Sequence, residues 1–158
     1  MNLESIKTKL EQANIYHSET EILDHRSVVG YEKVFKWRWL ATQLNTFIVA
    51  TDFGDQEITD GLLAHHLYES FNFADKNYTG WMRGMQSGTG VISIVISTNV
   101  TQEAKFYCIN SKSGKKFAAF TIPVVVDANT QEVFQFHSTP MWGLIYYPHF
   151  RKLINSLK

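Results

Sequence analysis

Val91-Ile-Ser-Ile-Val-Ile96 is the best candidate for a central β-strand in this chain, since nearly every position carries a β-branched apolar side chain. Thr46-Phe-Ile-Val-Ala-Thr51 is a second run of the same kind, as expected for a strand that is covered on both faces. Residues 117–126 form a third apolar run, but Pro123 lacks an amide hydrogen and so favours an edge or bulged strand. Together these runs predict a sheet with helices packed on it.

Residues 31–40 predict a half-buried strand, because charged and apolar side chains alternate along them. The alternation places Phe35, Trp37 and Trp39 on one face, which we expect to be buried. It places Lys36 and Arg38 on the other face, in contact with water.

The spacing of apolar residues predicts helices over residues 3–13, 55–75, 99–110 and 148–157, the second of them capped by Asp55. With a further strand over residues 132–137, the order contains two β-α-β units and a C-terminal hairpin. The prediction is one α+β domain over residues 1–158, with a mixed sheet of five or six strands and helices at both termini. A mixed α/β arrangement is the alternative.

The composition supports a folded domain. The chain has 158 residues, of which 44% are hydrophobic, 14% aromatic and 19% charged, and its formal net charge is +0. So many aromatic and so few charged residues exclude a disordered chain and a strongly basic nucleic-acid-binding arm. A neutral chain also lacks the self-repulsion that keeps molecules apart.

The neutral total conceals an asymmetry along the sequence. Residues 1–60 carry six Lys and Arg against ten Asp and Glu, a balance of −4, and residues 61–158 carry nine against five, a balance of +4. Either the two halves interleave in the fold and the asymmetry disappears, or complementary surfaces meet within one chain or between two.

The sequence predicts a cytoplasmic protein. Its first residues carry charges every few positions and lack the apolar run of a signal peptide, and no apolar run approaches the ~20 residues of a membrane helix. A single cysteine, Cys108, fits a reducing compartment, and its place on the inner face of a predicted helix suits an unreactive thiol. We expect no cofactor and no membrane partner.

A glycine-rich segment, residues 80–90, raises the possibility of phosphate binding, with Arg83 as the nearby cation. Phosphate loops follow a strand and open a helix, whereas this segment follows a helix and opens a strand. The favoured interpretation is a close-packed connection in which Trp81, Met82 and Met85 contact the core or a partner.

Polar side chains follow three predicted strands, where the carboxyl ends of parallel strands would bring them together. They are Asp52, Asp55, Ser97, Thr98, Asn99, Asp127 and Asn129. Carboxylate oxygens suit Mg²⁺, so Asp52, Asp55 and Asp127 are candidate metal ligands, with Ser97 or Thr98 positioning a substrate. Each aspartate is equally a helix cap or a turn former, which needs no ligand.

Histidines offer weaker candidates. His65 and His66 are adjacent and point in different directions on a helix, although His65 could touch Glu69. His137 and His149 could approach each other across the turn at Pro140 and would need a carboxylate partner to act as acid and base.

Nucleic-acid binding is not favoured, because the aromatic residues among Lys33, Lys36 and Arg38 are expected to face the core and the domain is neutral. We expect a non-enzymatic module that binds itself or another protein, and metal-assisted hydrolysis is the alternative. Aromatic, Met and Arg side chains are typical of interface cores. The candidate contact residues are Trp81, Arg83, Met85, Trp142, Tyr146 and Tyr147.

Overall fold

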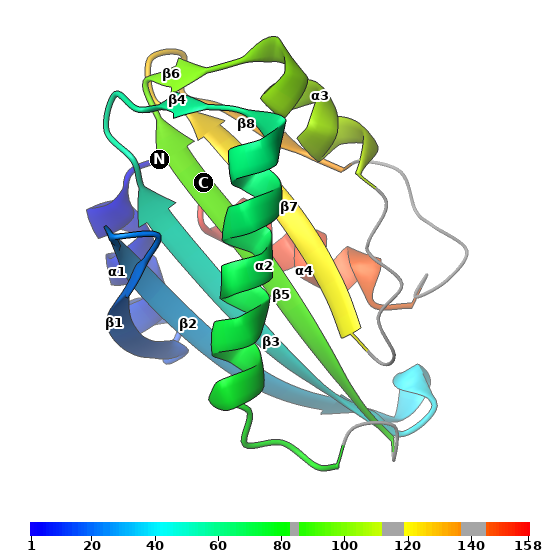
Figure 1. Cartoon of the computed structure of the whole chain (residues 1–158). Helices are drawn as coiled ribbons and strands as arrows, with labels where there is room; N and C mark the ends of the chain where they lie inside the picture. The colour runs from blue at the N-terminus through cyan, green and yellow to red at the C-terminus, as the bar shows by residue number, and fades with distance from the viewer. Residues whose placement is uncertain (83–85, 112–118, 137–144) are drawn as a thin grey trace.

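The computed structural model describes residues 1–82, 86–111, 119–136 and 145–158. It confirms a single α+β domain built on a six-stranded mixed sheet in the order β1-β2-β3-β5-β7-β8, with helices on both faces (Figure 1). Its elements are α1 (Leu3–Gln12), β1 (Tyr16–Ile22), β2 (His25–Lys36), the 3₁₀ helix η1 (Trp37–Trp39), β3 (Thr42–Asp52), β4 (Glu57–Ile58), α2 (Asp60–Lys76), β5 (Ser87–Ser97), β6 (Asn99–Val100), α3 (Gln102–Asn110), β7 (Ala119–Asp127), β8 (Glu132–Gln135) and α4 (Tyr147–Ser156).

The three central strands, β3, β5 and β7, run parallel, and α2 and α3 connect them over the same face of the sheet (Figure 1). β1 and β2 extend the sheet as an antiparallel meander, and β8 closes the other side as a hairpin with β7. The parallel strands therefore all begin at one end of the sheet and all finish at the opposite end. We call the end where they begin the amino edge and the end where they finish the carboxyl edge; these names do not refer to the outermost strands.

The core lies on both faces of the sheet. α1 and α4 cover one face, where Leu10 and Phe150 pack with Ile48 and Ile92, and α2 and α3 cover the other. Every residue of β5 is buried, which agrees with the run of β-branched side chains in residues 91–96. In the described ranges no helix is both long enough and apolar enough to cross a membrane.

The strand that contains Pro123 is not at an edge of the sheet. β7 pairs with β5 on one side and with β8 on the other. The pairing with β8 covers Val124 to Asp127, so the second neighbour of β7 stops one residue short of Pro123. Among the described residues, Pro123 thus lies just outside the ladder between β7 and β8, a position at which a missing amide hydrogen is tolerated.

The prediction of a buried aromatic face over residues 31–40 is confirmed for Trp39 and wrong for Phe35 and Trp37. β2 ends at Lys36, and residues 37–39 form a 3₁₀ turn that reverses the chain into β3. Leu40 and Ala41 complete the reversal in left-handed backbone conformations, with φ of 55° and 56°. Because the turn breaks the two-residue alternation, Trp39 enters the core while Trp37 stays on the surface. Phe35 lies before the turn, in β2 itself, and is 39% exposed.

Helix caps also differ from the prediction. Thr59, not Asp55, caps α2 by accepting a hydrogen bond from the backbone N–H of Leu62, at 3.2 Å. Thr101 caps α3 in the same way through Ala104. Both are threonines that directly follow the short strands β4 and β6, whose parallel pairing fixes where each helix begins.

Candidate functional site

The predicted polar residues do gather at the carboxyl edge. Asp52 ends β3, Ser97 ends β5 and Asp127 ends β7, with Ser97 and Asp127 directly opposite each other in the parallel ladder. Asp55 is exposed in the connection between β3 and β4. The structure therefore brings the strand ends together, as parallel strands require.

The two carboxylates that end strands stabilise the connections that follow them. Asp52 accepts a hydrogen bond from the N–H of Gly54 at 2.9 Å, and Asp127 accepts bonds from Asn129 and Thr130 at 3.1 and 3.3 Å. The other Asp127 oxygen pairs with the Lys105 ammonium at 2.9 Å, and this bond is the first of the causes that lower the pKa of Asp127.

The hydroxyl and amide groups of this edge are engaged in the same way. The Ser97 hydroxyl donates to the carbonyl of Gln56 at 2.7 Å and accepts from the N–H of Asn99, while the Asn129 amide donates to the carbonyl of Thr98. Among the described residues, no three His, Cys, Asp or Glu side chains are grouped so that they could hold a metal ion. The polar residues of the carboxyl edge thus act as turn formers and as an ion pair.

Two neighbouring histidines of α2, His65 and His66, have different surroundings. His65 is exposed, with its ring 4.0 Å from the Glu69 carboxylate. His66 is fully buried and is hydrogen-bonded through one ring nitrogen to Thr51 at 2.6 Å and through the other to Ser93 at 2.7 Å. Burial, with smaller contributions from the charges of His25 and His65, lowers the pKa of His66 to about 3, so the ring is neutral at physiological pH.

His149 has the carboxylate partner that the sequence could not identify. Its Nε2 lies 2.8 Å from a carboxylate oxygen of Glu32, and its ring packs edge-on against Trp39, 5.2 Å between ring centroids. The pair connects α4 to β2. His137 lies outside the described residues.

Cys108 is buried under α3, and burial raises the pKa of its thiol to about 12. A protonated, inaccessible thiol is a poor nucleophile. This position agrees with the inner helical face that the sequence predicted.

The largest group of exposed apolar side chains in the described residues lies at the amino edge. Five large apolar side chains are exposed there, and we call them the aromatic patch: Phe35, Trp37, Leu40, Trp81 and Met82. Trp37 and Leu40 are 81% and 82% exposed, and Met82 is 73% exposed. The Phe35 ring links the two segments of the patch, with its centroid 5.3 Å from that of Trp37 and 5.8 Å from that of Trp81.

The segment that carries Trp81 is held in place by a buried amide. Asn45 accepts a hydrogen bond from the Tyr31 hydroxyl at 2.9 Å and donates to Tyr78 at 3.2 Å. A Cβ on Gly80 would lie 2.5 Å from the same amide, so the backbone approaches Asn45 more closely than any other residue type allows. This arrangement fixes the backbone next to Trp81 while its ring stays at the surface.

Both ends of the Trp81 backbone are also hydrogen-bonded. Its N–H donates to the Gln43 side chain at 3.2 Å, and its carbonyl accepts from the Tyr78 hydroxyl at 2.6 Å. On the other segment, Leu40 and Ala41 adopt left-handed conformations that cost about 1–2 kcal/mol per residue. The N–H of Ala41 donates to the carbonyl of Trp37 at 3.2 Å and closes this turn. The patch is therefore presented by a constrained backbone.

Charge is divided between the two edges. At the amino edge Lys33, Arg38 and Lys76 are exposed and Lys36 is half-buried, with Asp75 as the exposed acid at the end of α2. The pKa of Lys36 is lowered, first by burial and then by the neighbouring Arg38 charge. Among the described residues of the amino edge, basic side chains therefore outnumber acidic ones, which are Asp75 and the half-buried Glu32.

The carboxyl edge and the turns beside it carry exposed acids: Glu21, Asp24, Asp52, Asp55, Glu57, Asp60 and Glu103. Two cations of this half are already paired, Arg26 with Glu4 and Glu19, and Lys105 with Asp127. In the described part of the chain, charge is thus separated along the strand direction. This separation does not follow the sequence asymmetry, because Lys33, Lys36 and Arg38 belong to the acidic first 60 residues.

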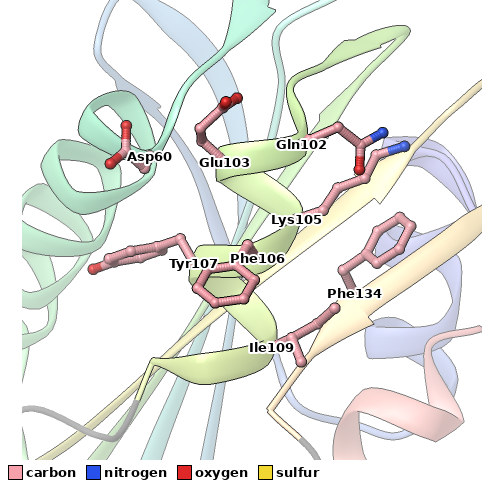
Figure 2. A pocket seen from close by; sticks show the side chains of 8 residues that line it. All are labelled: Asp60, Gln102, Glu103, Lys105, Phe106, Tyr107, Ile109 and Phe134. Carbon is pink, nitrogen blue, oxygen red and sulfur yellow. The ribbon is translucent and has the colours of Figure 1, made fainter.

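A second apolar surface lies on α3. Phe106 is 69% exposed and Ile109 is 40% exposed, and with Tyr107 and Phe134 they line an open pocket of about 600 Å³. Figure 2 shows Phe106 projecting from the middle of the helix, with Ile109 and Phe134 on one side and Tyr107 on the other. We call these four residues the α3 face.

The predicted contact residues divide between surface and core. Trp81 is half exposed and belongs to the aromatic patch, whereas Tyr147 is buried among Phe120, Phe136 and Phe150 and is not available to a partner. Tyr146 is half-buried against Trp39. Arg83, Met85 and Trp142 lie outside the described residues.

Sequence reasoning missed two features of these surfaces. Nothing in the alternation of residues 31–40 indicates that the strand ends at Lys36. The α3 face did leave a signal, because Phe106 and Ile109 are three residues apart and form a second apolar side opposite Ala104 and Cys108.

Comparisons of the chain with protein-family models, curated proteins and solved structures find no match.

Proposed function

We propose that the protein is a non-enzymatic binding module, and that the aromatic patch is the surface with which it contacts another protein, a second copy of itself included. The observation that supports this proposal is the exposure of Phe35, Trp37, Leu40, Trp81 and Met82 in one cluster on a constrained backbone. Soluble monomers expose large apolar patches rarely, and such patches commonly mark interaction sites.

The composition of the patch is typical of an interface. Trp, Phe and Met are enriched at interface cores, and Arg38, next to Trp37, is another residue type that frequently dominates binding energy. Burying an exposed side chain of this size contributes about 1.5–3 kcal/mol. Since the backbone is already ordered, little further conformational entropy is lost when a partner binds.

Site-specific photo-crosslinking tests the proposal. Trp37 is replaced by a benzophenone-bearing amino acid in cells that make the protein, and irradiation should yield a protein adduct that is absent when the same probe stands at position 68. Tyr68 is 55% exposed on α2, away from the patch, and so serves as the matched position. Equal or absent adducts from both positions would contradict the proposal.

A further inference from the structure

The α3 face and the aromatic patch have opposite electrostatic surroundings. Asp60 and Glu103 lie at the rim of the α3 pocket (Figure 2), and Lys105, the one cation among the described residues that line it, is paired with Asp127. The aromatic patch has Lys33 and Arg38 beside it. As far as the described residues go, one apolar surface thus has an acidic border and the other a basic one.

The two surfaces lie at opposite ends of the molecule and so cannot meet within one chain. α3 begins at the carboxyl edge, directly after β6, whereas η1 and the segment after α2 lie at the amino edge (Figure 1). A contact between them requires two copies of the protein.

We propose that the aromatic patch of one copy docks on the α3 face of a second copy, with Trp37 and Leu40 against Phe106 and Ile109. This inference rests on the proposed function and names the partner of the same surface. The apolar side chains would be buried at the centre of the contact, and Arg38 and Lys33 would approach the Glu103 and Asp60 of the other copy.

A symmetric contact between two aromatic patches is less favourable. A two-fold axis would place the Lys33 and Arg38 of one copy near the same residues of the other, and like charges at an interface are unfavourable. The contact between unlike surfaces leaves one free patch and one free α3 face on every dimer. Assembly therefore continues with concentration, either to a closed ring or to an open chain.

Complementation between two surface variants tests this arrangement. Trp37→Ser removes the patch and Phe106→Ser removes the α3 face, and since both side chains are largely exposed, both variants should fold. Tyr68→Ser is the control, at an exposed aromatic residue outside both surfaces. The oligomeric state is measured by sedimentation velocity over a range of concentrations, and circular dichroism confirms the fold of each variant.

The expected result is specific to a contact between unlike surfaces. Wild type and Tyr68→Ser associate with increasing concentration, and each of the two surface variants alone stays monomeric. Their equimolar mixture forms a dimer of one copy each and no larger species, because it contains one intact patch and one intact α3 face.

Charge reversal provides a second arm. Arg38→Glu and Glu103→Arg should each weaken association about tenfold, and mixing them should restore it, because each brings a charge opposite to its partner's. Glu11→Arg, at an exposed position of α1, is the matched control and should leave association unchanged.

Different failures have different meanings. A wild-type protein that is monomeric at every concentration overturns the inference and leaves the photo-crosslinking test of the proposed function to stand by itself. Association of Phe106→Ser at wild-type strength also overturns it, because the partner surface is then not the α3 face. Association of Trp37→Ser at wild-type strength contradicts both the inference and a role for the patch in self-association.

Discussion

Acidification should destabilise this protein through one buried side chain, His66. The ring is enclosed between α2 and the sheet, with Thr51 and Ser93 hydrogen-bonded to its two nitrogens. Burial lowers its pKa from 6.5 to about 3 in the folded state. The unfolded chain therefore takes up the proton first as pH falls, so the stabilisation is complete above pH 6.5 and is lost between pH 6.5 and pH 3.

The size of the effect follows from the two pKa values of His66. With 6.5 for the unfolded state and about 3 for the folded state, linkage gives a loss of about 2 kcal/mol in the free energy of unfolding between pH 7 and pH 5. This is a measurable fraction of the ~5–15 kcal/mol that stabilises a typical domain.

Urea unfolding at pH 7 and at pH 5 measures this loss. The wild-type protein is compared with His66→Gln, which cannot titrate, and with His65→Gln, its exposed neighbour on the same helix. The loss between the two pH values should be about 2 kcal/mol smaller in His66→Gln than in wild type and unchanged in His65→Gln. If His66→Gln loses as much stability as wild type, the ring titrates normally and the reasoning is refuted.

Three further predictions concern packing and reactivity. Trp39→Ala should lower the free energy of unfolding by about 3–5 kcal/mol while Trp37→Ala changes it by less than ~0.5 kcal/mol, as measured by urea unfolding, and equal effects would contradict the assigned burial. Gly90→Ala should cost about 1–3 kcal/mol in the same assay, because its Cβ would lie 2.4 Å from the ring of Phe150, and a neutral effect would show that the ring can move aside. Cys108 should react with a thiol reagent at the rate of global unfolding, and fast labelling of the native protein would argue against its burial and raised pKa.

The sheet could be predicted because its central strands are buried on both faces. Continuous apolar runs such as those of β5 and β7 have few alternative structures in a soluble domain, and the helical periodicity between them implies parallel crossovers. The N- and C-terminal helices followed from spacing and from Pro148 at the start of α4.

The end of β2 could not be predicted, for a local physical reason. Leu40 and Ala41 adopt left-handed conformations that sequence reasoning reserves for glycine, asparagine and aspartate. Without that turn, Trp37 would continue the alternation of the strand and be buried with Trp39. The error reversed the assignment of the residues that now form the most exposed apolar surface of the described structure.

The hydrogen-bonded His66 cluster was equally hidden from sequence. Its members come from separate elements, Ser27 from β2, Thr51 from β3, Ser93 from β5 and Ser70 from the same helix as His66. Each is an ordinary polar residue in its own segment, and only the tertiary packing brings them into contact.

For the carboxyl-edge aspartates, the position could be predicted and the partners could not. The parallel strands bring the strand ends together as expected, but Asp52 is bonded to a local turn and Asp127 to Lys105.

The most direct test of a self-docking aromatic patch is ¹⁹F NMR of protein labelled with 5-fluorotryptophan, with signals assigned by single Trp→Phe variants. As the concentration rises, the Trp37 and Trp81 signals should shift and broaden, because these rings enter the contact, while the signal of the buried Trp39 stays unchanged. Signals of Trp37 and Trp81 that are no more sensitive to concentration than that of Trp39 would contradict self-association through the aromatic patch.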